Sequence, residues 1–168
     1  MINVVIPMAG IGTRFLNAGY VTPKPFIEVN GKSLIELVLE NLELIEAQFI
    51  LLVREEHIKT QARTLSKITK KFNVQILSIP KVTEGATCTI LHAHRLINTE
   101  IPLLIANSDQ FIDANIQDYI DNCIQRNLDG SILTFIDAEN NPKWSFAKIN
   151  TDGDVLEVQE KNPIKYKN

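Results

Sequence analysis

The chain has 168 residues, of which 45% are hydrophobic and 22% are charged, as is typical of a soluble globular domain with a core of its own. A net charge of −3 without any cluster of Lys and Arg argues against a nucleic-acid partner. No apolar run approaches the ~20 residues of a membrane-spanning helix, and the N-terminus lacks the features of a signal peptide. We therefore expect no membrane partner and a cytoplasmic location.

Apolar runs and helix-like runs alternate along the chain. The apolar runs, rich in β-branched residues, predict strands at residues 2–9, 48–54, 73–80, 101–109 and 130–138. The segments between them predict helices at residues 33–46, most of 55–71, 83 or 84 to about 97, and 114–127. Ser33 and Glu36 form a capping box for the first helix, and Asp113 is the expected cap of the last. This alternation predicts a mostly parallel sheet covered by helices on both faces.

The pattern changes after Asn140. The segments SFAKIN and VLEVQEK flank the dipeptide Asp152-Gly153, which is a hairpin turn signal. We therefore expect an antiparallel hairpin at the C-terminal end of the α/β core. The chain contains no internal repeat and no linker, which predicts a single domain over residues 1–168.

The stretch IPMAGIGTRF, residues 6–15, runs from an apolar strand into a glycine turn that ends in a cation. Ligands of open α/β sheets bind at the carboxyl ends of the strands, so this turn is a candidate anion site. A dinucleotide fingerprint would need glycine at Phe15, and a P-loop ending in the GKS of residues 31–33 would need glycine at Phe26. Neither of these phosphate-binding motifs fits, and NGKS is better explained as a turn followed by a helix cap.

Lys24 lies between two prolines in the segment TPKP, residues 22–25. Proline fixes its own backbone and disfavours helix at the preceding residue, so this lysine is held in a rigid, extended segment. The loop that contains it has about twenty residues, and loops of that length inside compact domains tend to be functional. Arg14 and Lys24 together could clamp a polyphosphate; the alternative is that both are surface charges in a long loop.

The segment MAGIGTRFLNAGYVTPKPFIEVNGKSLIE, residues 8–36, resembles the signature of the sugar-phosphate nucleotidyltransferases, or nucleotide-sugar pyrophosphorylases. It contains their G-x-G-T/S-R loop, their P-K-P and a capped helix, in order. TEGATCTIL at 83–91, IANSDQFI at 105–112 and VQEKNP at 158–163 agree more weakly. The resemblance covers essentially the whole chain. It implies a Rossmann-like, GT-A-type three-layer α/β/α sandwich.

The resemblance also implies a reaction. Such enzymes transfer a nucleoside monophosphate from an NTP to a sugar phosphate or another phosphorylated small molecule and release pyrophosphate. The protein supplies position and charge neutralisation rather than a covalent nucleophile. The nucleotide-binding residues that the resemblance implies are Ala9, Gly10, Gly12, Thr13, Gly85 and Asn107.

The remaining implied roles belong to charged residues. Arg14 would neutralise the leaving pyrophosphate, and Lys24 would hold the α-phosphate. Asp109 would bind Mg²⁺; the alternative is a turn residue at a strand end. Glu160 and Lys161 would bind the acceptor, unless they are an ordinary exposed pair. Trp144 could stack on a sugar or base or simply pack, and the three histidines are assigned no role.

Three departures from the family pattern leave substrates open. SIPKVTEG, residues 78–85, offers no Gln to read the base, and Ser145-Phe146 replaces a Tyr-Gly of the acceptor region. The family normally continues past E-K-P to a second metal-binding aspartate, whereas this chain ends at Asn168. We therefore expect a shortened form, with self-association through the hairpin as a further expectation. The alternatives are a catalytically weak nucleotide-binding or regulatory module and a related glycosyltransferase; the latter usually has an acidic pair where SDQ, residues 108–110, has one acid.

Overall fold

The structure is a computed structural model that describes residues 1–42 and 46–164. It divides into two compact units, Met1–Gln117 and Asp118–Asn168, and each is described by itself. That residues 1–168 form one domain stays a prediction. No helix in the described ranges is both long and apolar enough to cross a bilayer.

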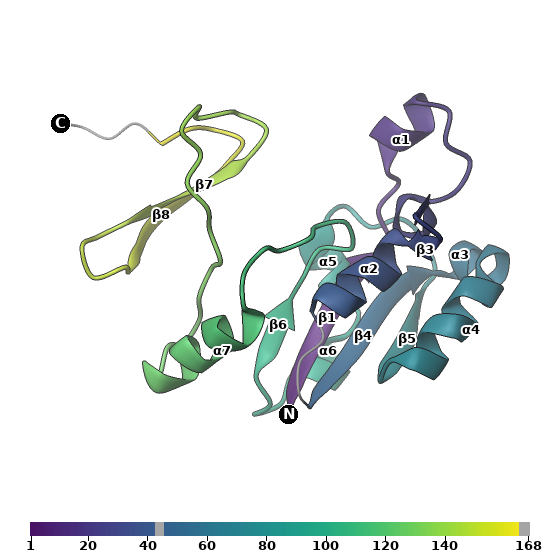
Figure 1. The fold of residues 1–168 in the computed structure, drawn as a ribbon, viewed down its shortest axis with the longest axis horizontal. Helices are drawn as coiled ribbons and strands as arrows, with labels where there is room; N and C mark the ends of the chain where they lie inside the picture. Colours follow the sequence, from purple (N-terminus) through teal and green to yellow (C-terminus); the bar gives the residue numbers. More distant parts are fainter. Residues whose placement is uncertain (43–45, 165–168) are drawn as a thin grey trace. The chain divides into compact units, whose positions relative to one another are not determined.

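A four-stranded parallel sheet organises the first unit (Figure 1). Its strands, in spatial order, are β5 (Val74–Ile79), β4 (Ala47–Arg54), β1 (Ile2–Met8) and β6 (Leu103–Ile105). In register, Val5 lies opposite Ile50 on one side and Ile105 on the other. The strands predicted at 2–9, 48–54 and 73–80 are thus confirmed; β1 and β4 are mostly buried, as suits inner strands covered on both faces, whereas β5 is a partly buried edge strand.

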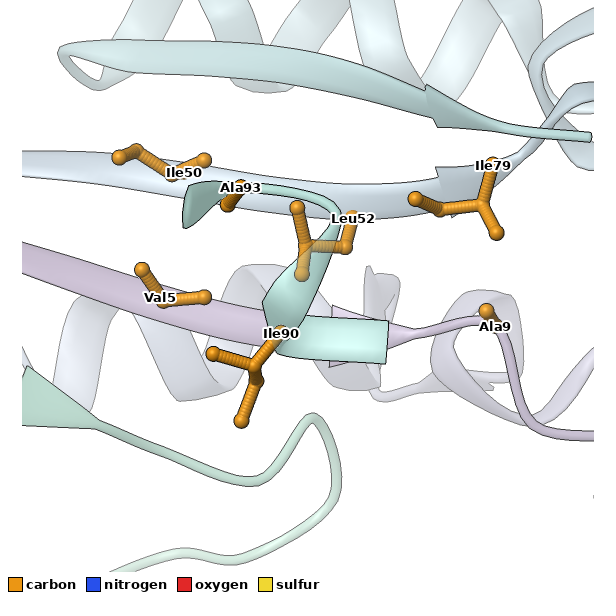
Figure 2. Close-up of a cluster of buried hydrophobic side chains, with 7 residues drawn as sticks. All are labelled: Val5, Ala9, Ile50, Leu52, Ile79, Ile90 and Ala93. Carbon is orange, nitrogen blue, oxygen red and sulfur yellow. The ribbon is translucent and has the colours of Figure 1, made fainter. Parts of the chain in front are cut away.

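Successive side chains of these strands point to opposite faces, so each face has its own core. On one face, Val5, Ile50 and Leu52 pack with Ile90 and Ala93 (Figure 2). Ile90 belongs to α5 (Ala86–Leu91), and Ala93 directly precedes α6 (His94–Ile97). Figure 1 shows α2 (Leu34–Asn41) and α4 (Ala62–Lys71) on the opposite face. The three-layer arrangement is therefore confirmed.

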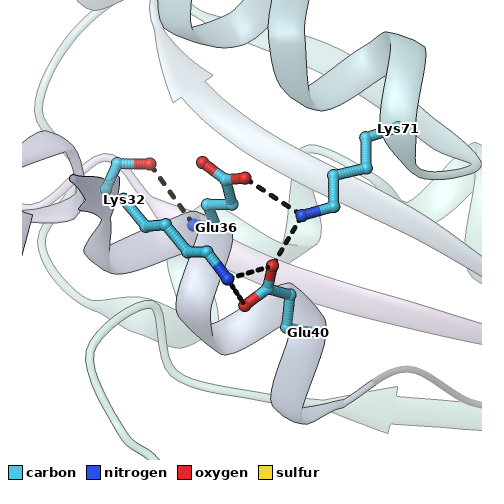
Figure 3. Close-up of polar contacts among 5 residues, drawn as sticks. Lys32, Glu36, Glu40 and Lys71 are labelled. Carbon is cyan, nitrogen blue, oxygen red and sulfur yellow. Dashed lines mark hydrogen bonds and ion pairs between the residues drawn. The ribbon is translucent and has the colours of Figure 1, made fainter. Parts of the chain in front are cut away.

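Charged side chains join α2 to α4 at the surface (Figure 3). Lys71 Nζ donates to Glu36 Oε1 at 3.1 Å and to Glu40 Oε1 at 2.5 Å, and Lys32 Nζ also reaches Glu40, at 2.8 Å. These partners hold the pKa of Glu40 below its usual range, with Lys32 the largest cause. Ser33 caps α2 as predicted, since its Oγ accepts from the Glu36 amide at 3.4 Å. The described part of this helix ends at Asn41, and residues 43–45 of the predicted 33–46 lie outside the described residues.

Two long predicted helices are each divided in two. The segment 55–71 forms α3 (Glu55–Thr60) and α4, separated at Gln61. The segment expected to begin at Thr83 or Glu84 forms α5, which begins at Ala86 after the extended Gly85, and then α6. Ala93, in the break between α5 and α6, is fully buried, so packing on the sheet sets this break.

The prediction of a strand over 101–109 was too long, because β6 covers Leu103–Ile105. The Ala106 amide still donates to the Val5 carbonyl at 3.0 Å, and the chain then turns away from the sheet. The polar residues that follow are therefore in a turn at the carboxyl end of the sheet.

The long loop after β1 contains short ordered elements, which are α1 (Thr13–Asn17), a 3₁₀ turn η1 (Lys24–Phe26), β2 (Glu28–Val29) and β3 (Lys32–Ser33). Between β2 and β3, Asn30 and Gly31 both have positive φ, of 51° and 80°. This is the backbone that a tight two-residue hairpin requires, and glycine adopts it without strain. The predicted NGKS turn and helix cap are confirmed.

α7 (Ile116–Gln125) begins later than predicted. The Gln117 amide donates to Asn115 Oδ1 at 3.0 Å, so Asn115 caps this helix and the assignment of the cap to Asp113 was wrong. The strand predicted at 130–138 is also wrong, since these described residues form no strand and Ile136 is 97% exposed. An apolar run becomes a strand only where another strand supplies hydrogen bonds, and no strand in the described part of the chain pairs with this one.

The predicted C-terminal hairpin is confirmed. β7 (Ser145–Ile149) and β8 (Val155–Glu160) pair antiparallel, with Phe146 opposite Gln159. Gly153 has a φ of 85° in the connecting turn. The α/β class with a mostly parallel sheet and this antiparallel pair is thus as expected.

Candidate functional site

The glycine turn leaves the carboxyl end of β1. Ala9 is fully buried at the end of the strand, and Gly10 is exposed with open space around the position of a Cβ. Gly12 has a φ of 68°, and a Cβ added to it would lie 3.5 Å from Lys24 Cβ. That distance is an ordinary van der Waals contact, so glycine is favoured at this position by its left-handed backbone rather than by lack of space.

Lys24 begins the 3₁₀ turn η1, so the extended backbone predicted for it from the flanking prolines is wrong. Its Nζ lies 4.9 Å from the centroid of the Phe15 ring of α1, within range of a cation–π contact. Phe15 in turn packs edge-on against Tyr20, with centroids 5.5 Å apart. The glycine turn, α1 and Lys24 thus form one local structure.

Lys24 Nζ also forms an ion pair with Asp109 Oδ2, 85 residues away in the sequence. Asp109 follows β6, and β6 is the parallel neighbour of β1. The two side chains are 30% and 32% exposed, so a solute can reach both charges. The structure therefore brings together the lysine and the aspartate that the sequence marked separately, at the carboxyl edge of the sheet.

Asn107 lies between β6 and Asp109, where its Nδ2 donates to Gln110 Oε1 at 2.7 Å. Thr13 and Arg14 lie in α1 and are exposed. Within the described ranges, the Arg14 guanidinium has no ion-pair partner, unlike Lys24. This cation is therefore available to an anion without first leaving a carboxylate.

Gly85 precedes α5, with its carbonyl accepting from the Thr89 amide at 3.0 Å and from Thr89 Oγ1 at 3.1 Å. A Cβ at this glycine would meet no atom within 4 Å. The space at this position is therefore open, and nucleotide binding beside Gly85 stays a prediction.

The carboxylates at this site could bind Mg²⁺ only together with a phosphate ligand. No group of three or more His, Cys, Asp or Glu in the described part of the chain could enclose a metal. Asp109 supplies one accessible carboxylate beside the candidate phosphate site. Mg²⁺ often takes one or two carboxylates and completes its shell with substrate phosphates and water, so these residues fit an ion that arrives with a polyphosphate.

Glu160 and Lys161 lie at the end of β8 in the second unit. Their side chains are exposed and pair with each other at 3.0 Å, and the backbone φ of Lys161 is 53°. A role in acceptor binding stays a prediction. Trp144 packs edge-on against Phe135, with centroids 5.1 Å apart, which favours the packing role over stacking on a ligand.

The structure adds two residues beside the site to which the sequence analysis gave no role. His57 is buried, and its Nε2 lies 2.5 Å from Arg54 Nη2. Burial is the main cause that lowers the pKa of His57 from its usual 6.5, and the Arg54 charge lowers it further. The available sequence signal was that Arg54 ends a predicted strand at the ligand-binding edge.

Comparisons with known proteins identify the family. A model of the nucleotidyl transferase family matches residues 3–167. The chain therefore belongs to the nucleotidyl transferase family, and it is a nucleotidyltransferase enzyme. None of the curated proteins matches the chain at a significant level.

Similar solved structures agree with this fold. A nucleoside-diphosphate-sugar pyrophosphorylase from Vibrio cholerae RC9 has 27% identity and a TM-score of 0.71, over 96% of this chain and 68% of that one. A UDP-glucose pyrophosphorylase complexed with UDP-glucose has 18% identity and a TM-score of 0.76, over 96% and 70%. HddC from Yersinia pseudotuberculosis complexed with GMP-PN has 22% identity and a TM-score of 0.71, over 95% and 69%.

Proposed function

We propose that the protein transfers a nucleoside monophosphate from an NTP to a sugar phosphate, or to another phosphorylated small molecule, with Mg²⁺ as cofactor. The observation that carries this proposal is the contact of Lys24 with Asp109 beside the glycine turn. Family membership and the neighbours complexed with UDP-glucose or GMP-PN support the nucleotide and sugar-phosphate classes.

In this proposal the triphosphate lies along the glycine turn. Backbone amides from Gly10 to Thr13 donate to its oxygens, as in other anion-binding turns. Arg14 neutralises charge that develops on the departing pyrophosphate. Lys24 leaves Asp109 and holds the α-phosphate for in-line attack by the acceptor's phosphate oxygen. Catalysis then comes from position and charge rather than from a covalent intermediate.

Mg²⁺, when bound, neutralises and orients phosphate oxygens. Asp109 would be its ligand from this chain, and Asn107 would contact the nucleotide beside it. In the free protein, Lys24 and Asp109 neutralise each other, which keeps both partly buried charges satisfied. Gly85 leaves space for the base and sugar, while Glu160 and Lys161 would bind the acceptor.

A pyrophosphate-release assay tests the proposal. The protein is incubated with Mg²⁺, each of the common NTPs and dTTP, and a panel of hexose 1-phosphates and polyol phosphates. We expect release with at least one pair, dependent on both substrates and lost on adding EDTA. Nucleotide binding without release for any acceptor would contradict the transferase role and favour a binding module.

Two further expectations accompany this function. A cytoplasmic location suits an enzyme that consumes nucleoside triphosphates. Self-association through the β7–β8 hairpin is supported by the exposed side chains of Val155, Leu156 and Val158, and light scattering would test it.

A further inference from the structure

A buried ring contact joins the turn that carries Lys24 to α3. Phe26, the last residue of η1, is 3% exposed, and His57 of α3 is 2% exposed. Their ring centroids are 6.0 Å apart with an interplanar angle of 82°, which is an edge-to-face arrangement. Both rings are therefore closed to solvent, and neither is available to a substrate.

The His57 ring is held by a second contact. A guanidinium only donates hydrogen bonds, so Arg54 Nη2 must donate to His57 Nε2, and the imidazole is the neutral tautomer with its proton on Nδ1. Glu56 Oε2 lies 3.7 Å from Arg54 Nη2. The charge of Glu56 raises the pKa of His57, whereas the charge of Arg54 lowers it. Arg54 is the last residue of β4. Its hydrogen bond therefore orients the His57 ring relative to the central sheet.

The 3₁₀ turn transmits the position of Phe26 to Lys24. The Phe26 amide donates to the Pro23 carbonyl at 2.8 Å, and the Ile27 amide donates to the Lys24 carbonyl at 3.2 Å. Pro25 fixes one of the backbone dihedrals between Lys24 and Phe26, and the two hydrogen bonds close the turn. We therefore expect a shift of the Phe26 backbone to shift the start of the Lys24 side chain.

We propose that His57 is a positioning residue for nucleotide binding: its ring, oriented by Arg54, seats Phe26 and so sets where Lys24 meets the triphosphate. This inference rests on the proposed function, in which Lys24 holds a phosphate. It assigns His57 no contact with substrate. It gives the two parts of the side chain different roles: the ring packs on Phe26, and Nε2 accepts a hydrogen bond from Arg54.

Two conservative variants separate these parts, and binding of Mg²⁺–tripolyphosphate is measured by calorimetry. His57→Gln keeps an acceptor for Arg54 and removes the ring, whereas His57→Phe keeps the ring and removes the acceptor. We expect about three- to tenfold weaker binding for His57→Gln and a smaller loss for His57→Phe. Both variants are then repeated in a Lys24→Ala background, where the His57→Gln effect should disappear.

The double-mutant cycle distinguishes positioning from packing. A His57→Gln loss of equal size with and without Lys24 would mean that the contact only stabilises the fold, which overturns the inference. A Lys24→Ala variant that binds as tightly as the parent would instead overturn the proposed role of Lys24. Should His57→Gln fail to fold, Phe26→Leu removes the partner ring and enters the same cycle.

A measurement without ligand tests the inference independently of the proposed function. The amides of Phe26 and Ile27 close the η1 turn, so their hydrogen exchange reports its order. We expect faster exchange at both amides in His57→Gln than in the parent, with His57→Phe close to the parent. Unchanged exchange at both amides in His57→Gln would show that the ring does not hold this turn.

Discussion

Replacing Asp109 by Asn removes one charge of the ion pair with Lys24 and nearly preserves the size of the side chain. Without divalent metal, the Asp109 carboxylate competes with a triphosphate for Lys24 and repels its negative charge. With Mg²⁺, the same carboxylate is the proposed metal ligand. Asp109→Asn should therefore tighten polyphosphate binding without metal and weaken it with metal.

The exposure of the pair sets the size of the metal-free effect. Both side chains are about one third exposed, at 30% and 32%, so solvent reaches the pair and screens it in part. Such pairs contribute about 0.2–1 kcal/mol, which corresponds to about 1.4- to 5-fold tighter binding when the competition is removed. The loss of a metal ligand should weaken Mg²⁺-dependent binding by about tenfold or more.

Calorimetry with tripolyphosphate, in EDTA and in Mg²⁺, measures both effects on one protein preparation. Asp113→Asn is the matched control, because Asp113 is an exposed carboxylate four residues further on and is not expected to contact the ligand. A change of the same sign in both conditions would refute the reasoning, as would an equal effect of the control variant.

Three further predictions follow from single contacts. Arg14→Ala should weaken NTP binding by about 1.5–3 kcal/mol without lowering the melting temperature, since this exposed cation has no ion-pair partner in the described residues and its proposed charge-assisted contact is with the ligand; unchanged affinity would contradict that role. Leu52→Ala should lower the free energy of unfolding by about 2–5 kcal/mol in denaturant titrations, whereas Leu91→Ala, at an exposed helix position, should have little effect. The free energy of unfolding should fall as the pH falls below about 6.5, because His57 is protonated in the unfolded chain at a pH where its lowered pKa keeps it neutral in the folded protein. His57→Phe should remove this part of the pH dependence. The same dependence of the unfolding free energy on pH in parent and variant would contradict this prediction.

The strands of the central sheet could be predicted where local sequence and packing agree. β1 and β4 are runs of mostly buried apolar residues, β5 is a partly buried edge strand, and each pairs with a neighbour along most of its length. The run at 130–138 has the same composition, yet no strand pairs with it in the described residues. Hydrophobicity shows that a segment can be buried, whereas strand pairing depends on residues far away in the sequence.

The same distinction applies to the helix breaks. The segment 83–97 has a continuous helix-like pattern, but the chain turns before α6 so that Ala93 packs on the sheet beside Val5 and Ile50. That choice is made by the tertiary core and leaves no Gly or Pro signal in the sequence. Helix propensity alone could therefore not predict it.

The candidate site divides in a similar way between what the sequence shows and what it hides. The sequence places the Lys24 loop and Asp109 each after a strand, at the carboxyl edge of the sheet, whereas the pairing of β1 with β6, which brings the two residues together, is found only in the structure. The role of His57 could not be predicted from the sequence. It depends on packing against Phe26, which lies in a turn of irregular backbone, and on the direction of the Arg54 side chain. Topology predicts which residues can meet a ligand, while the buried contacts that hold them in place depend on side-chain packing. Residues of the second kind therefore need a structure to be found, and in this protein one of them packs on Phe26, two residues after the lysine that the sequence singled out.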